Sequence, residues 1–598
     1  QYRLLADASQ PDVVYTTNTP IQENIYTDKD DVKKVVSMTP VKYDSNGKVM
    51  EDDDGDAIVD ESKFAIKVAT QNVLNYFNSP FGGAENKNGG NRGAESLEEF
   101  ERQEAKIVKG IHALDADILG LMEIENNGFG EKSAISQLVA KVNEKYTESQ
   151  RFNPEADDSA AKRYVFVGFD SDGNTVLDDE DKVGSDVITS GIIYRPYKVS
   201  MVSSQIINMP RQVAPPIVDE NGSPIISSRD KTMRESGKNY MRDTVAARFR
   251  INGTGKSVTI AVNHLKSKGS TCWEDWQGWQ EWEGFDASNH YASVRDDDFQ
   301  GSCENFRVAG AQRLGEVMSR IKGDKMLIGD FNSYGHEDPM RVLTDLNGGN
   351  VKAAAYTLVG SVPQFGKNGS QISKSFGYIN AVELKDKEKN KASWSYSYGD
   401  QVGSLDHMLI SPSLKKNLLD AADWHVNSVE SSSYGYNNKY TENEGNTTAH
   451  KYYEDNVYRS SDHDPAIVTL AYKYNEAGDE KLLLPIVNSL AKVSYVVPDG
   501  VELDKYTDIV AEITAPSHPS DAKELTLPKI KLDSKKVVHF DVAGIVKGGY
   551  TFSMKLRGVL VPEQGAAATQ AEEELVLVDI PGSEVTLQAE VSSTDSLT

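Results

Sequence analysis

A series of short apolar runs, each bordered by a polar or charged side chain, constrains the fold of this chain more than any other feature. The runs Phe64 to Asn72 and Ser257 to His264 illustrate the pattern, because each is rich in strand-forming residues and ends in a side chain capable of chemistry. One polar strand end is an ordinary solvated turn, but this recurrence indicates that the ends meet in space. The side chains at the run ends are Asn72, Glu123, His264, Asp330, Asn332, Asp406, Asp462 and His463.

The order of the runs predicts an α+β fold in which helices cover sheets. Strand-like runs outnumber helical ones, and several neighbours are close enough in sequence to pair antiparallel. Ser96 and Glu99 form a capping-box pattern at the start of the first predicted helix. The predicted strands are residues 64–72, 117–123, 164–169, 187–194, 244–250, 257–264, 325–329, 405–410 and 466–472, and the predicted helices are residues 96–113, 134–146 and 305–321.

Length, composition and apolar patterning divide the chain into three parts. At 598 residues it is too long for one ordinary core. Residues 1–62 are polar and acid-rich, which predicts an extended or linker segment, or the end of a preceding domain. Residues 63–474 carry the runs described above. From residue 475 to 598, alternating Val, Ile and Leu with Pro and Gly predicts a small all-β, sandwich-like domain.

The polar run ends together make up the inventory of metal-assisted phosphodiester hydrolysis. Such chemistry needs carboxylate and amide oxygens that hold a hard cation. It also needs a carboxylate or imidazole that activates water, and donors for the charge that grows on the phosphate oxygens. A single histidine or acid of this set is more often structural, so the prediction depends on the whole set.

Several motifs resemble, in their order, those of the endonuclease/exonuclease/phosphatase superfamily, whose members include DNase I. The wording around Asn72 and His264 is similar to the bacterial extracellular nuclease branch. The resemblance covers residues 63 to 474. The motifs are Gln71-Asn-Val73, Met122-Glu123, Asn263-His264, Gly329-Asp-Phe-Asn332, Ser404-Leu-Asp-His407 and Ser461-Asp-His-Asp-Pro465.

The resemblance implies a four-layer α/β/β/α sandwich with a metal site at one edge. Glu123 would ligate Mg²⁺ or Mn²⁺ with help from Asn72 and Asp462. His463, oriented by Asp406, would act at the scissile phosphate as a base or as a transition-state stabiliser.

The resemblance also assigns residues that would contact water and substrate. Asp330 and Asn332 would position the attacking water and the phosphate, and His264 would donate to a phosphate oxygen or to the leaving group. Phosphate contacts are implied for Arg242, Tyr194 and Arg195. In DNase I the second histidine is paired with a glutamate, whereas here the nearest candidate for that partner of His264 is Asp186.

The net charge of −27 opposes binding of a polyanion such as DNA. A nucleic-acid enzyme of this composition would need bound metals or local cations that overcome the overall field. Lys266, Lys268 and Arg307 are candidates for such a basic rim, and the alternative for each is a solvated side chain.

The two cysteines, Cys272 and Cys303, are expected to form one disulfide that pins a surface loop, as in an exported protein. Four tryptophans recur inside this loop at every third residue, from Trp273 to Trp282. Packing of the loop onto its domain is the preferred interpretation, and base stacking is the alternative.

An acidic segment has the oxygen spacing of a calcium loop, through Asp170, Asp172, Asn174, Asp178 and Asp181. It lacks the glycine expected at the sixth position of an EF-hand loop. A Ca²⁺ site and an acidic hairpin turn remain equal alternatives.

These observations predict an extracellular, metal-dependent deoxyribonuclease of bacterial type, secreted or held at the cell surface. The chain starts at Gln1, as expected of a processed product, and no apolar run approaches the roughly 18 residues of a membrane span. The expected partner is DNA, with RNA left open, and the expected state is a monomer. The alternatives are a phosphodiesterase for phospholipids or inositol phosphates, and a surface binding protein with an inactive nuclease fold.

Overall fold

The computed structural model describes most of the chain. The described residues are 2–3, 35, 37–146, 156–172, 177–227, 231–254, 256–282, 298–399, 401–437, 453–474, 491–515, 525–526, 530–531, 537–542, 548–560 and 578–591.

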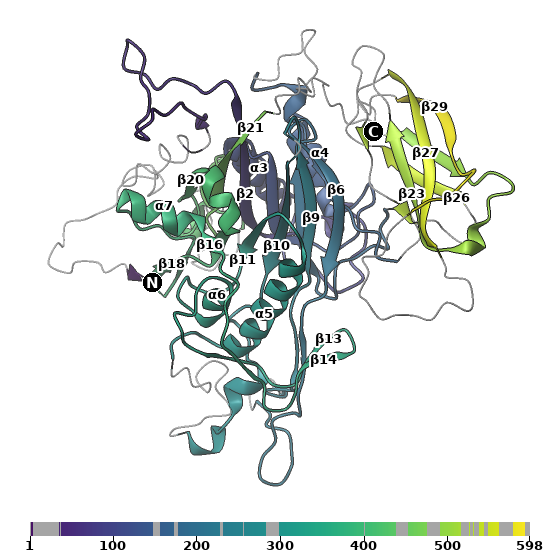
Figure 1. Cartoon of the computed structure of the whole chain (residues 1–598). Coiled ribbons are helices and arrows are strands. Elements are labelled where there is room, and N and C mark those ends of the chain that lie inside the picture. Colours follow the sequence, from purple (N-terminus) through teal and green to yellow (C-terminus); the bar gives the residue numbers. More distant parts are fainter. Residues whose placement is uncertain are drawn as a thin grey trace.

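Two six-stranded mixed sheets form the centre of the large domain (Figure 1). In the first sheet, β10 and β11 run parallel and the other neighbours antiparallel; in the second, only β2 and β3 run parallel. The first sheet has the order β16 (Ile379–Asn380), β19 (Asp406–Ile410), β11 (Asp324–Asp330), β10 (Lys256–His264), β9 (Thr244–Ile251), β6 (Val199–Ile207). The second has the order β20 (Leu418–Asp423), β21 (Ala466–Lys473), β2 (Lys63–Tyr76), β3 (Ile118–Glu125), β5 (Ile188–Tyr194), β4 (Val165–Phe166).

Alternation along the strands separates two apolar layers. In β10, Val258, Ile260 and Val262 belong to the core between the sheets, whereas Ala261 belongs to the core beneath a helix on the outer face. The two sheets approach closely at Gly120, where an added Cβ would lie 2.8 Å from Val262. The α+β prediction is therefore confirmed for this domain.

Helices cover the outer faces of both sheets. α3 (Leu97–Leu114) and α4 (Ala134–Asn143) contact the second sheet, and α5 (Glu304–Arg320) packs on the first sheet with α6 (Asp338–Leu343). The predicted cap of α3 is present, since Ser96 accepts a hydrogen bond from the Glu99 backbone N–H, although Glu99 reaches back to the N–H of Glu95. α7 (Ala381–Lys389) contacts β19 and β20.

Short strands extend the domain around this sandwich. One group is β7 (Arg211–Val213), β8 (Lys238–Tyr240), β13 (Thr357–Val359) and β14 (Val362–Phe365), and another is β12 (Val351–Ala353) with β15 (Ser370–Ile372). The hairpin of β17 (Tyr396–Tyr398) and β18 (Gln401–Gly403) pairs with β1 (Tyr2–Arg3). None of the helices in the described part of the chain combines the length and apolar character that crossing a membrane requires.

The flanks agree with the sequence only in outline. Three isolated β-bridges pair residues within 41–59, and Val35 is buried in the main core, while the role of the segment 1–62 as a linker stays a prediction. The described elements beyond residue 490 are strands and one short 3-10 helix, and the domain boundaries remain predictions. The strands are β22 (Ala491–Val496), β23 (Tyr506–Ala515), β24 (Leu525–Thr526), β25 (Ile530–Lys531), β26 (Val537–Val542), β27 (Gly548–Leu560), β28 (Val578–Asp579) and β29 (Val585–Val591).

Candidate active site

Strand pairing brings the predicted run ends to one edge of the two sheets. In the first sheet, His264 is opposite Asp330, and Asp330 is opposite Asp406. In the second sheet, β2 and β3 run parallel, so Asn72 and Glu123 lie close to the same edge. β21 (Ala466–Lys473) runs antiparallel to β2 and begins three residues after His463, which carries this histidine to the same place.

A buried aspartate–histidine pair is held by a network of short hydrogen bonds. His463 Nδ1 lies 2.7 Å from Asp406 Oδ2, and Ser395 Oγ donates to the same oxygen over 2.7 Å. The backbone N–H groups of Leu405 and Asp406 donate to Ser395 Oγ, and the ring of Tyr396 lies 4.6 Å from the His463 ring. This arrangement fixes the ring plane of His463 and leaves its Nε2 facing Asp330 at 3.7 Å.

Glu123 is held beside this pair by amide donors. Asn72 Nδ2 donates to Glu123 Oε1 over 3.2 Å, and the Asn75 backbone N–H donates to Oε2 over 3.0 Å. Glu123 and Asn332 both have positive φ angles, 67° and 47°, a strained conformation for residues with a Cβ. Such strain gathers where the surrounding structure fixes side chains for function.

Asp330 lies between the two histidines. Its Oδ1 accepts the Asn332 backbone N–H over 2.8 Å, and its Oδ2 lies 3.5 Å from His264 Nε2. Asn332 Nδ2 donates to the carbonyl of Leu265, so Asn332 is tied to the end of the neighbouring strand.

Burial and neighbouring charges shift the pKa values of these groups in different directions. Burial raises the pKa of Asp330 to about 7, and burial together with Asp462 raises that of Glu123. Burial and the nearby Arg242 hold the pKa of His264 well below its usual value. Burial would also lower the pKa of His463, but Asp406, Asp330 and Asp462 together raise it well above the usual value.

The donor set fits a hard divalent cation. Asp330, Asp406 and His463 place one ligand atom each within 4.8 Å of the others, and Glu123 and Asp462 add carboxylates that repel each other. Acids buried this closely need a compensating positive charge, which a divalent ion supplies. Asn72 presents its Nδ2 to Glu123 and Asp330, and its Oδ1 accepts the Leu74 backbone N–H, so the assignment of Glu123, Asn72 and Asp462 as the metal ligands stays a prediction.

Arg242 lies at the rim of the cluster, and the expected carboxylate partner of His264 is absent from it. Arg242 Nε donates to Asp186 Oδ2 over 3.0 Å, and Arg92 Nη1 lies 3.3 Å from Asp186 Oδ1. Asp186 therefore serves these two arginines, and His264 Nδ1 has no hydrogen-bond partner among the described residues. The interpretation of Asp186 as the partner of His264 is wrong.

Tyr194 and Arg195 lie at the opposite edge of the second sheet. Tyr194 pairs with Ile118, the first residue of β3, whereas Glu123 is near its end. The ring of Tyr194 packs against Phe249 at 5.0 Å. Buried Arg195 lies 2.7 Å from a carboxylate oxygen of Asp115, so a phosphate contact for either residue is contradicted.

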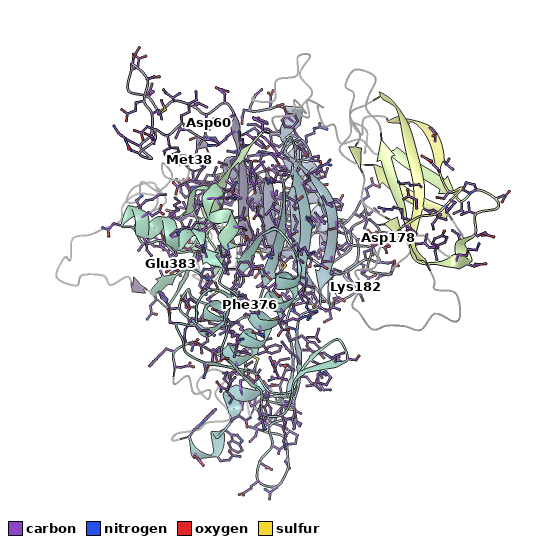
Figure 2. The ribbon with its side chains drawn as sticks, in the orientation of Figure 1. Met38, Asp60, Asp178, Lys182, Phe376 and Glu383 are labelled. Carbon is purple, nitrogen blue, oxygen red and sulfur yellow. A yellow bond between two sulfur atoms is a disulfide. The ribbon has the colours of Figure 1, made fainter. Side chains whose placement is uncertain are left out.

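The acidic loop brings three of its predicted ligands together. Asp170, Asp172 and Asp181 offer oxygens that lie within 4.8 Å of one another, while Asn174 lies outside the described residues. Buried Asp181 accepts the backbone N–H groups of Ser171 and Asp178 (labelled in Figure 2). Such hydrogen bonds are expected both in an acidic turn and in an ion site. Both interpretations of the loop therefore stay open.

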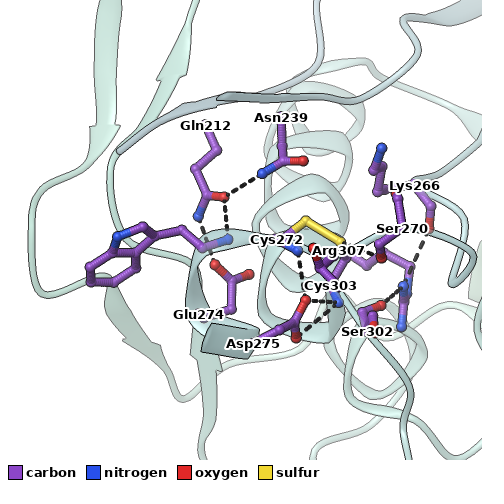
Figure 3. The surroundings of a disulfide bond; sticks show 12 residues. Gln212, Asn239, Lys266, Ser270, Cys272, Glu274, Asp275, Ser302, Cys303 and Arg307 are labelled. Carbon is purple, nitrogen blue, oxygen red and sulfur yellow. Dashed lines mark hydrogen bonds between the residues drawn. A yellow bond between two sulfur atoms is a disulfide. The ribbon is translucent and has the colours of Figure 1, made fainter. Parts of the chain in front are cut away.

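The predicted disulfide is present, and it anchors the tryptophan loop (Figure 3). Asp275 accepts the backbone N–H groups of both Cys272 and Cys303, and Trp276 is buried in a small apolar cluster, which agrees with packing. Arg307 is fully buried and donates to backbone carbonyls, among them those of Lys266 and Ser302, so it is no part of a basic rim. Lys266 is half-buried, and Arg242 contributes to its lowered pKa after burial itself.

Sequence reasoning missed four residues that shape the cluster. Ser395 and Tyr396 sit in a short Trp394-Ser-Tyr396 stretch without strand periodicity, and Asn75 and Arg92 flank a Gly- and Asn-rich loop. Only Asn75 follows a predicted strand end closely, and no sequence signal marked the other three.

Comparisons with known proteins give structural likenesses alone. Neither a protein-family model nor a curated protein sequence matches the chain. The human Nocturnin catalytic domain with bound sulfate is 15% identical, with a TM-score of 0.32, covering 68% of this chain and 95% of that one. An endonuclease/exonuclease/phosphatase from Bacteroides vulgatus is 12% identical with a TM-score of 0.32 (68% and 99%), and D. rerio TDP2 complexed with single strand DNA product is 12% identical with a TM-score of 0.30 (68% and 98%). Scores this low carry no argument, so the function is inferred from the cluster itself.

Proposed function

We propose that the chain is a divalent-metal-dependent phosphodiester hydrolase and that its substrate is DNA. The convergence of the Asp406–His463 pair with Glu123, Asn72 and Asp330 at one sheet edge carries the proposal. A structural role alone does not call for several buried acids and two histidines at a strained strand edge, whereas hydrolysis of a charged ester does.

Each side chain has a role that follows from its partners. A Mg²⁺ or Mn²⁺ ion held by Glu123, Asn72 and Asp462 would neutralise charge on the scissile phosphate. Asp330, fixed by the Asn332 N–H, would orient the attacking water and accept its proton.

The histidines would act on the phosphate oxygens. His463, held by Asp406, would present a proton on Nε2 to the oxygens that gain charge in the transition state. His264, with its Nε2 toward Asp330, would contact a phosphate oxygen or the leaving group. No step in this scheme requires a covalent intermediate.

DNA is preferred over the other phosphodiesters because cations border the cluster. Arg242 and Lys266 provide positive charge next to His264 in a chain of net charge −27. A lipid substrate would favour an exposed apolar hairpin, and the described part of the tryptophan loop, residues 273–282, does not supply one, since Trp276 is packed against Ile217 and Ile225. An inactive binding protein would have no need to hold His463 and Asp406 in one fixed geometry.

The setting of the enzyme is also part of the proposal. One disulfide and no free cysteine among the described residues suit a secreted or cell-surface bacterial protein, acting as a monomer. RNA as an additional substrate, and Ca²⁺ at the Asp170 loop, remain proposals of lower rank.

Digestion of supercoiled plasmid tests the function. Wild type is compared with Asp462→Ala and His463→Ala in Mg²⁺, in Mn²⁺ and after EDTA. Nicking that requires metal and is lost in both variants supports a DNA endonuclease. An intact plasmid under all metals, at low and high salt, would refute it, and linear DNA, RNA and phospholipids would be assayed next.

A further inference from the structure

The loop before α3 places a third cation at the rim of the site. Arg92 is half-exposed, and its guanidinium lies 3.3 Å from Asp186, the carboxylate that also holds Arg242. Because one carboxylate neutralises only one of two guanidinium groups, this pair of arginines keeps a net positive charge.

The loop is built to hold this arginine in place. Asn88 Nδ2 donates to the carbonyl of Asp186, so the loop is bonded to the same segment as its arginine. Gly93 packs so closely on the Asn75 carbonyl that an added Cβ would lie 2.3 Å from it. Asn75 in turn donates its N–H to Glu123. Arg92 is therefore adjacent in sequence to a glycine that packs on a residue of the cluster.

Lys266 adds to the positive charge of this rim. Arg242 and Arg92 both repel its ammonium, and Asp186 and the buried Glu235 attract it. Glu235 already accepts the backbone N–H of Gly237 and the Thr271 hydroxyl. The three cations of this patch therefore face Asp186 and the engaged Glu235, and Arg242 also attracts Glu123 of the cluster.

We propose that Arg92, with Arg242 and Lys266, forms a subsite for a phosphate next to the scissile one, so that the preferred substrate is a polynucleotide strand and not an isolated phosphodiester. The inference rests on the proposed function and names the substrate class of that site. A strand carries a second phosphate that can contact the rim, whereas a small diester has none. Arg92 would therefore strengthen binding of the strand and not of the small diester.

Binding is measured first, so that the subsite is tested separately from catalysis. Arg92→Ala, Arg92→Lys and Arg320→Ala are each made in the His463→Ala protein, and the affinity for a labelled oligonucleotide is followed by fluorescence anisotropy at several salt concentrations. Arg320 is the matched control, because it is an exposed arginine at the end of α5. It lies just before the first residue of β11, and the last residue of that strand, Asp330, is the one in the cluster.

Arg92→Ala is expected to weaken binding roughly fivefold at low salt, since an exposed charge contact is modest. The slope of log affinity against log salt should shrink by about 0.7 to 0.9, the contribution of one phosphate contact. Arg92→Lys should keep most of the slope, and Arg320→Ala should keep all of it. Unchanged binding in Arg92→Ala, or an equal loss in Arg320→Ala, would overturn the subsite.

Hydrolysis then separates the two proposals. With His463 restored, Arg92→Ala should lower kcat/KM for the oligonucleotide more than for bis(4-nitrophenyl) phosphate. If wild type cleaves the small diester with metal but binds no strand, the hydrolase stands and the subsite is refuted. If wild type cleaves neither substrate, the proposed function fails, and the anisotropy series alone decides the subsite.

Discussion

Substitution of Asp406 by asparagine tests whether Ser395 locks the tautomer of His463. Ser395 Oγ accepts two backbone N–H groups, from Leu405 and Asp406, each over 3.0 Å. A hydroxyl has two lone pairs and one hydrogen, so the hydrogen must point to Asp406 Oδ2 at 2.7 Å. In Asp406→Asn this position must still be an acceptor, and the amide oxygen must occupy it.

His463 should therefore keep donating from Nδ1 in the variant. What is lost is the charge of the acceptor, and a hydrogen bond to a charged group exceeds a neutral one by about 1 to 1.5 kcal/mol. The expected fall in kcat/KM for bis(4-nitrophenyl) phosphate is roughly tenfold. A wrong tautomer, as in Ser-His-Asp hydrolases, would lower kcat by about 10⁴.

The double variant Ser395→Ala/Asp406→Asn removes the Ser395 hydroxyl that fixes the tautomer of His463, so the side-chain amide introduced at position 406 can rotate and place its NH2 group toward His463. Its loss should exceed the product of the two single losses by more than tenfold in a double-mutant cycle. Asp423→Asn is a control, because Asp423 is a buried aspartate of β20 outside the cluster, and thermal unfolding reports on folding. A loss near 10⁴ in Asp406→Asn alone, or additivity in the cycle, would refute the lock.

Three further predictions concern the rest of the domain. Reduction of the Cys272–Cys303 disulfide, which spans 31 residues, should lower the free energy of unfolding by about 3 to 4 kcal/mol in urea titrations with and without reductant. Burial raises the pKa of Asp423 from 3.8 to about 8, so the contribution of its protonated carboxyl to stability is complete below pH 4 and is lost as the pH rises toward 8. The melting temperature of Asp423→Asn should therefore rise relative to that of the wild type over this pH range. A constant difference between the two melting temperatures from pH 4 to 8 would contradict the prediction. Arg195→Ala should lower stability by about 3 to 5 kcal/mol because it removes the guanidinium beside the fully buried Asp117 as well as one partner of Asp115, and a raised KM for DNA with unchanged stability would contradict its placement.

The strands and the polar side chains at their ends could be predicted because both follow from local pattern. β10 and β11 each have a strand pattern that ends in a side chain capable of chemistry, which predicted that these ends meet; the structure adds that the two strands run parallel, which brings His264 and Asp330 to one edge. The positions of Asn72 and Glu123 follow in the same way from β2 and β3.

The errors arose where direction or tertiary contact decides. β5 runs antiparallel to β3, so its last residue, Tyr194, lies at the edge away from Glu123, although the motif that contains it suggested otherwise. Ser395 gains its role only when the strand that carries Asp406 lies against it, and no periodicity in the sequence marks that contact. Asp186 likewise finds Arg242 across 56 residues of chain, which no spacing rule indicates.

The net charge of −27 is compatible with a polyanionic substrate, because the overall charge and the cations at the site act over different distances. At physiological ionic strength, charges farther apart than about 8 Å are largely screened. A phosphate bound at Arg92 and Arg242 is governed by these contacts, whereas an approaching strand still meets the field of the whole chain. The overall charge therefore slows association, and the rim cations and the metal govern how long the strand stays bound. Arg92 belongs to the second group, which is why its removal should appear mainly in the dissociation rate.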